Sequence, residues 1–257
     1  MKNYLPCCSL FLLALTAVAM PAHTGDAVAD SNRHTYVIVH GAWGGGWAFK
    51  QVEQHLHANG HTVYRPTLTG QGEKVHLATP EINLSTHITD IVNVILWEDL
   101  HDIVLVGHSY GGAVITGVVD RLPDRIKHVI YLDAAILNDG ESVVEANGRG
   151  LPGDVVDGGI IPSWVTPDQP IPHDVPHPVK TLTEPLKLTN QNTAQQIPTS
   201  YVLFVEPDSP IEEARFYSFY LRAKARGWTL RTLTSDHNAQ WSHPMELAAV
   251  LEDATKD

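Results

Sequence analysis

The stretch LVGHSYGGAVITGV, residues 105–118, decides the predicted fold of this chain. Ser109 stands between Gly107 and Gly111 in the pattern G-x-S-x-G, with an apolar run on each side. The run before it is typical of a buried strand, and the run after it is typical of a helix. A serine on a sharp strand-to-helix turn is a nucleophile elbow, in which small neighbours allow the turn and the hydroxyl stands above the sheet. The alternative is a glycine-rich turn whose serine only caps the helix, but the strand and helix patterns favour the elbow.

Strand and helix patterns alternate along most of the remaining chain. Helices are expected at residues 47–60, 84–100 (with Ser85 as N-cap), 111–122, 210–227 and 243–254. Strands are expected at residues 35–42, 61–67, 102–107, 127–135, 200–206 and 228–234. Strands with nearly unbroken apolar runs are typical of a parallel sheet that is covered on both faces. We therefore predict one α/β domain over residues 35–257, with a mostly parallel, doubly wound sheet.

Residues 138–198 interrupt this alternation. They are rich in Pro, Gly, Asp and Thr, and a loop of such length is usually a functional lid or disordered. The apolar and aromatic side chains within it, including Ile160, Ile161 and Trp164, favour a folded cap. Because open α/β sheets bind ligands at the carboxyl ends of their strands, we expect the cap to cover that edge.

The N-terminal segment indicates where the protein is located, and the net charge limits which partners it binds. Residues 10–20 are apolar, and small residues follow the A-x-A pattern at Ala17 and Ala19, with Ala22 beyond them. This pattern predicts a signal peptide over residues 1–22, cleaved after Ala19 or Ala22, and a secreted or periplasmic protein. The apolar run is too short to span a membrane. A net charge of −12 without a Lys or Arg run argues against nucleic acid as a partner.

A serine hydroxyl needs a base and an oxyanion hole to act as a nucleophile. His237 follows the last expected strand, where this chain order places the base, whereas His243 precedes Pro244 and fits a helix entry. One oxyanion donor is the amide N–H of Tyr110, directly after the serine. The loop after the first strand offers the amide of Ala42 as the second donor.

Two aromatic residues complete the predicted site, and the sequence carries no motif for a metal or a cofactor. Trp43 and Trp164 are expected to line the substrate pocket. Neither a Gly-Lys-Ser/Thr phosphate loop nor an H-E-x-x-H motif is present, so no metal and no cofactor is predicted.

The residue that orients the base has two main candidates. Asp133 ends the fourth expected strand among apolar residues, where a carboxylate needs a partner, and His237 would supply one. Asp208 follows the strand after the cap, but Asp208-Ser209-Pro210 also fits a helix N-cap with proline in the first turn. Glu206 is a third candidate. The residues alone leave Asp133 and Asp208 open.

Several stretches together resemble bacterial α/β-hydrolases of the salicylate-esterase and pyrethroid-hydrolase type, which are related to plant methylesterases and hydroxynitrile lyases. They are VIVHGAWGGGWAF, GHTVYRPTLTGQGEKVHL, INLSTHITDIV, VLVGHSYGGAVITGVVDRLPDRI, VIYLDAAILNDGES and DHNAQWSHPMELAAVL, within residues 36–252. The resemblance implies an α/β-hydrolase fold with Ser109 as nucleophile and His237 as base. It also implies that the amides of Ala42 and Tyr110 form the oxyanion hole.

This chain differs from these families at positions that bear on the identity of the acid and on the reaction. Plant methylesterases place the acid where Asp208 aligns, whereas many bacterial relatives keep the one that matches Asp133. Asn238 stands where the lyases carry Lys, and Gly44 where relatives often carry His. The expected activity is hydrolysis of a small to medium apolar or aromatic carboxylic ester through an acyl-enzyme. The alternatives are a non-catalytic small-molecule-binding homologue and a hydroxynitrile lyase.

Overall fold

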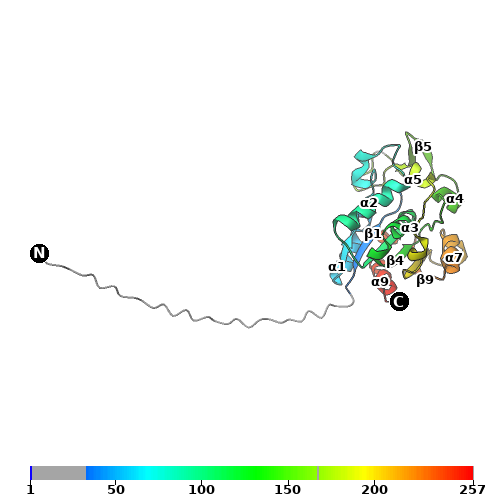
Figure 1. Cartoon of the computed structure of the whole chain (residues 1–257). Coiled ribbons are helices and arrows are strands. Elements are labelled where there is room, and N and C mark those ends of the chain that lie inside the picture. The colour runs from blue at the N-terminus through cyan, green and yellow to red at the C-terminus, as the bar shows by residue number, and fades with distance from the viewer. Residues whose placement is uncertain (2–32, 167, 257) are drawn as a thin grey trace. The chain divides into compact units, whose positions relative to one another are not determined.

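Six strands form one sheet in the computed structural model, which describes Met1 and residues 33–166 and 168–256. All neighbouring strands of this sheet run parallel, in the order β2-β1-β3-β4-β8-β9 (Figure 1). The strands are β1 (Thr35–Val39), β2 (Thr62–Tyr64), β3 (Ile103–His108), β4 (Ile126–Leu132), β8 (Thr199–Val205) and β9 (Thr229–Thr234). The expected parallel sheet is thus confirmed. Residues 2–22 of the predicted signal peptide lie outside the described residues.

Alternating side chains of the strands bury two cores, one on each face of the sheet. Tyr36 and Ile38 of β1 belong to the core packed by α1 (Lys50–Ala58) and α9 (Pro244–Ala254). Val37 and Val39 belong to the core packed by α2 (Leu84–Trp97), α3 (Gly111–Arg121) and α7 (Tyr217–Ala225). Burying one such aliphatic side chain contributes about 1.5–3 kcal/mol to stability, so both faces hold the sheet in place.

The structure corrects the start of the second helix. Asn83, not Ser85, is the N-cap of α2. Its side-chain oxygen accepts a hydrogen bond from the Thr86 backbone amide at 2.9 Å, and the Thr86 hydroxyl accepts one from the Asn83 backbone amide. The Ser85 amide and hydroxyl instead bind the carboxylate of Glu184 in the cap. A capping box satisfies two backbone donors reciprocally, which explains why the helix begins two residues earlier than a Ser85 cap allows.

Short helical turns replace parts of the expected helices and loops. Residues 47–60 divide into η1 (Gly46–Phe49) and α1, and residues 210–227 into η4 (Ile211–Glu213) and α7. Ala214 between them has extended ψ, so the helix cannot run through. Three further short elements are η2 (Gly72–Leu77), η3 (Pro123–Arg125) and α8 (Ala239–Ser242).

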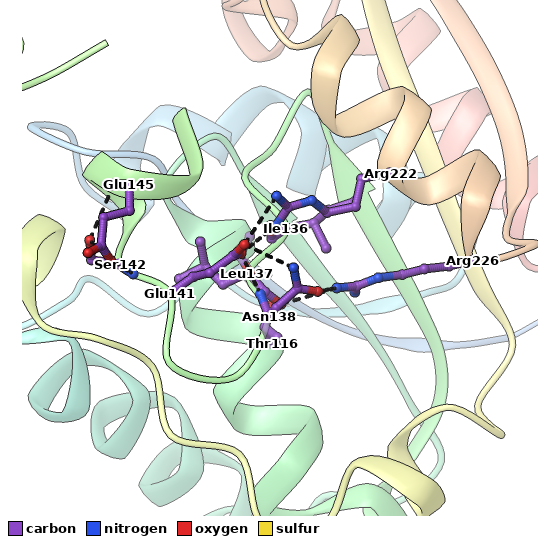
Figure 2. Close-up of polar contacts among 10 residues, drawn as sticks. Thr116, Ile136, Leu137, Asn138, Glu141, Ser142, Glu145, Arg222 and Arg226 are labelled. Atoms are coloured by element: carbon purple, nitrogen blue, oxygen red, sulfur yellow. Dashed lines mark hydrogen bonds and ion pairs between the residues drawn. The ribbon is translucent and has the colours of Figure 1, made fainter. Parts of the chain in front are cut away.

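Residues 138–198 fold over the sheet as short elements. They contain α4 (Val143–Asn147), α5 (Lys180–Thr183), α6 (Gln191–Ala194) and a small antiparallel sheet of β5 (Asp154–Val156), β6 (Gly159–Ile161) and β7 (His177–Pro178). Figure 2 shows Arg222 of α7 and Arg226, the residue after α7, reaching to the start of this segment, where they bind Glu141 and Asn138. These ties fix the entry of the cap to the core.

No helix in the described ranges is long and apolar enough to cross a membrane.

Candidate active site

Ser109 occupies a strained turn between β3 and α3. Its φ of 55° lies in the left-handed region, which a non-glycine residue adopts only when the surroundings hold it there. The Ser109 amide donates to the carbonyl of Leu132 at 3.1 Å, and the amide of Ala135 donates to the Ser109 carbonyl at 3.0 Å. The end of β4 therefore fixes the turn that presents the Ser109 hydroxyl.

The glycines on either side of Ser109 are required by close packing. A Cβ atom at Gly107 would lie 2.7 Å from the carbonyl oxygen of Gly111, and one at Gly111 would lie 2.5 Å from that of Val39. Both distances are shorter than real Cβ atoms show, so a larger residue at either position would force the backbone of the elbow to shift.

His237 connects Ser109 to Asp133. It lies in the loop between β9 and α8, with Nε2 3.0 Å from Ser109 Oγ and Nδ1 2.6 Å from Asp133 Oδ2. Asp133 follows β4 directly, and its other oxygen, Oδ1, accepts from the amide of Phe204 at 3.2 Å. The Asp133 side chain is 2% exposed and that of His237 is 21% exposed. This arrangement has the geometry of a nucleophile, base and orienting acid in a catalytic triad.

The structure separates the two candidate acids. Asp208 is exposed in the turn after β8, and within the described ranges no hydrogen bond or ion pair joins it to His237. The N-cap alternative for Asp208 is also not observed, because Pro210 holds the N-cap position of η4 without a side-chain bond. Glu206 is likewise exposed. Of the candidate acids, only Asp133 is in contact with the base.

The alternative base, His243, lies apart from Ser109. His243 is the N-cap residue of α9, and its Nδ1 is 3.0 Å from Ser235 Oγ.

Burial disfavours charge on the His237–Asp133 pair. It lowers the pKa of His237, and the positive charge of Arg215 lowers that pKa further. Burial also raises the pKa of Asp133, against the opposing bond from the Phe204 amide. A neutral His237 carries its proton on Nδ1, because that atom faces the carboxylate. Its Nε2 is therefore free to accept the Ser109 hydroxyl proton.

The amides of Ala42 and Tyr110 lie at the same cleft as Ser109. Tyr110 directly precedes the first turn of α3, whose N-terminus carries partial positive charge. In the part of the chain that the structure describes, neither amide donates to a protein acceptor. Both donors are thus available to an oxyanion that forms above Ser109.

The cleft at Ser109 encloses about 70 Å³ and is mostly apolar. Trp43 lines it, as expected, whereas Trp164 does not. The Trp164 ring packs edge-on against Trp43 at 5.4 Å, and its indole N–H donates to Asp174 at 3.0 Å. The remaining walls come from both the cap and the core: Ala135, Val143, Val144, Asn147, Gly150, Pro152, Leu182, Arg215, Phe216 and Phe219.

Phe216 and Arg215 are site residues that the sequence analysis missed. The Phe216 ring stacks on the His237 ring at 5.0 Å and 6°, and the Arg215 guanidinium lies 5.9 Å from the centre of the Phe216 ring. Both residues fall in the middle of the helix expected at residues 210–227, where their side chains have no distinctive pattern. No residue pattern there signals the break at Ala214, because Pro210 also fits the first turn of a continuous helix.

No group of three or more His, Cys, Asp or Glu side chains in residues 33–166 and 168–256 is arranged to hold a metal ion.

A family model described as "Alpha/beta hydrolase family" matches residues 36–250. The chain belongs to the alpha/beta hydrolase family. Among curated members of similar sequence, a carbendazim hydrolyzing esterase from a Nocardioides species is 45% identical over 120 residues, which are 47% of this chain and 50% of that protein. A pyrethroid hydrolase from Sphingobium wenxiniae is 34% identical over 106 residues, which are 40% of this chain and 37% of that protein. The chain thus spans half or less of the length of these relatives.

A solved structure shows the same alpha/beta hydrolase fold along most of the chain. An extracellular alpha/beta-hydrolase from a Paenibacillus species superposes with a TM-score of 0.69 at 24% identity, covering 87% of this chain and all of that one. At this level of identity the similarity establishes the fold.

Proposed function

We propose that this alpha/beta hydrolase is a serine-dependent carboxylic ester hydrolase that acts through an acyl-enzyme. The observation that carries the proposal is the continuous chain Ser109–His237–Asp133, with contacts of 3.0 and 2.6 Å, at a strained elbow beside two available amides. Relatives named as an esterase and a hydrolase support this reaction class.

The first half of the reaction acylates Ser109. Its Oγ attacks the ester carbonyl carbon while the hydroxyl proton passes to Nε2 of His237, and Asp133 stabilises the imidazolium. The carbonyl oxygen becomes an oxyanion that accepts from the amides of Ala42 and Tyr110. The carbon–oxygen bond to the alcohol then breaks, and Nε2 returns its proton to the departing alkoxide.

Water completes the reaction on the same residues. His237 takes a proton from water, the hydroxide attacks the acyl carbon, and a second oxyanion forms in the same place. When this intermediate collapses, the bond to Ser109 Oγ breaks, the proton on Nε2 returns to Oγ, and the carboxylic acid departs. No metal or cofactor enters these steps.

The cleft supports a small to medium apolar or aromatic ester as substrate. Its walls are aliphatic and aromatic, and its volume of about 70 Å³ favours a short group on one side of the ester. A panel of esters that varies acyl and alcohol size, with carbendazim and a pyrethroid included, measures this preference. We expect the shortest acyl groups to be turned over fastest.

A pre-steady-state burst with p-nitrophenyl acetate tests the proposal. The wild-type chain should release p-nitrophenol in a burst equal to the enzyme concentration, and Ser109→Ala should release none above background. Equal release by both proteins would rule out Ser109 as nucleophile.

Hydroxynitrile lyase activity is the alternative, and the loop after the base argues against it. Asn238 stands there without a positive charge, and its backbone N–H donates to Asp236 Oδ1 at 2.8 Å. We expect no cyanide release from mandelonitrile above background. A non-catalytic binding role is tested by the same burst measurement.

We further propose that the protein is exported, because its first 22 residues contain an apolar run followed by small residues. N-terminal sequencing of protein recovered outside the cytoplasm should begin after Ala19 or Ala22. An uncleaved N-terminus would contradict this.

A further inference from the structure

His108, the residue before Ser109, contacts the base directly. Its Nε2 lies 2.9 Å from the backbone carbonyl oxygen of His237, although 129 residues separate the two in the chain. The two imidazole rings are 4.7 Å apart. His108 is only 4% exposed and does not line the cleft. It therefore contacts the catalytic machinery without being placed to contact a substrate.

The bond from His108 has a defined direction. A carbonyl oxygen only accepts, so His108 donates from Nε2–H. Burial and the neighbouring His237 lower the pKa of His108, which keeps the ring neutral and this tautomer in place at neutral pH. Phe49 and Phe204 pack around the ring, with centroids 5.8 and 6.3 Å away, and restrict its rotation.

The loop that carries His237 has few other backbone attachments. In the described part of the chain, the remaining backbone hydrogen bonds of residues 236–238 stay within residues 236–242. Ser235, the first residue of this loop, donates its amide to the Val205 carbonyl at 2.9 Å. For residues 236–238, among the described residues, the bond to His108 is thus the long-range backbone tie, while Asp133 holds only the imidazole edge.

The other edge of His108 faces the oxyanion loop. A Cβ atom at Gly41 would lie 3.2 Å from His108 Nδ1, so the backbone just before Ala42 packs against this ring. His108 therefore touches the loop of the base and the loop of one oxyanion donor, and it adjoins the nucleophile in sequence.

We propose that His108 is a positioning residue, whose Nε2–H fixes the backbone of His237 and thereby the distance from His237 Nε2 to Ser109 Oγ. This inference rests on the proposed function. Loss of the bond releases the loop, and a displacement of about 1 Å at a reacting group lowers a rate by up to about 10²-fold. The Michaelis constant should change little, because His108 is outside the cleft.

Three variants separate the donor from the ring. His108→Phe keeps an aromatic ring but removes the donor, His108→Gln can place an amide N–H near the position of Nε2, and His108→Asn is too short to do so. His128→Phe is the matched control, because His128 is also 4% exposed and the substitution removes a buried imidazole whose Nε2 lies 3.0 Å from Ser200 Oγ. His128 lies near the start of β4, away from the end that precedes Asp133.

The experiment measures kcat and KM for p-nitrophenyl acetate, corrected for active sites titrated with diethyl p-nitrophenyl phosphate. We expect His108→Phe to lower kcat by about 10- to 100-fold with KM nearly unchanged. His108→Gln should recover most of this loss and His108→Asn little of it. His128→Phe should keep the wild-type kcat per titrated site, whatever its effect on stability.

A kcat for His108→Phe within twofold of wild type would overturn the proposal. If His108→Phe does not fold, the other two variants decide: a clearly higher kcat for Gln than for Asn supports the donor role, and equal values overturn it. Failure of the proposed function is a separate result, because the titrant would then not react with the wild-type chain.

A proton NMR spectrum provides a readout that does not depend on turnover. The Nδ1 proton between His237 and Asp133 should give a downfield resonance in the wild-type protein and in His128→Phe. In His108→Phe we expect it to shift or broaden. An unchanged resonance in this variant would show that the base keeps its position without His108, and the proposal would be wrong.

Discussion

Asp133 and His237 are 104 residues apart in the chain, yet Oδ2 of one lies 2.6 Å from Nδ1 of the other. The contact forms because β4 ends beside β3, which carries the nucleophile, and because the loop after β9 returns across the carboxyl end of the sheet. Asp208, in the turn after β8, remains in solvent. The acid therefore comes from the strand next to the elbow strand, and this assignment can be tested.

Asp133→Asn should lower kcat by about 10⁴-fold, because an amide at this position favours the wrong tautomer of His237. Asp208→Asn is the matched control and should leave kcat within a few-fold of wild type. The measurement is kcat for p-nitrophenyl acetate at neutral pH. The reverse pattern, with the loss at Asp208, would contradict the geometry of the pair.

The acid limb of the pH–rate profile should lie below the ordinary histidine pKa of about 6.5. Activity requires neutral His237, and both burial and Arg215 lower its pKa, so the base stays neutral to lower pH. Arg215→Gln removes the positive charge, which raises the pKa of His237 and moves the acid limb of kcat/KM to higher pH. Arg215→Lys keeps the charge and should leave the limb near its wild-type position. A limb that does not move in Arg215→Gln would show that this charge does not act on the base.

Gly111→Ala should destabilise the fold by about 1–3 kcal/mol, since the new methyl group would lie 2.5 Å from the Val39 carbonyl oxygen. Gly44→Ala is the control, because the nearest heavy atom to its Cβ would be 3.8 Å away. Urea unfolding of both variants measures the difference. Equal stability would mean that the elbow can relax around a side chain at Gly111.

Asn83→Ala should lower the free energy of unfolding by about 1 kcal/mol, because it removes the acceptor of the α2 capping box. Ser85→Ala should have a smaller effect, since its bond to Glu184 is exposed to solvent. Thermal or urea unfolding of the pair checks the order, and a larger loss for Ser85→Ala would assign the cap to Ser85 after all.

Local patterns were sufficient for the sheet and for most of the candidate site. The apolar strands and the glycines around Ser109 identify the elbow, because buried parallel strands and tight turns restrict residue choice strongly. His237 followed from chain order. The choice between Asp133 and Asp208 could not be made in this way, since both residues follow a strand and only the packing of β4 beside β3 decides which one reaches the base.

The cap and the cleft walls were the least predictable parts. Trp164 has the composition of a pocket residue, but the cap directs it against the outside of Trp43. Phe216 and Arg215 reach the site because the chain breaks between η4 and α7, where periodicity indicated one helix. His108 occupies a variable position of the G-x-S-x-G pattern, and its contact with the His237 carbonyl depends on a loop 129 residues away.

Covalent labelling of Ser109 tests the central claim most directly. The wild-type protein is treated with a fluorophosphonate, its intact mass is measured, and the modified peptide is identified. We expect one adduct per chain, located on Ser109, with no adduct in Ser109→Ala and strongly slowed labelling in His237→Ala. Labelling of another residue, or equal labelling of Ser109→Ala, would contradict this claim.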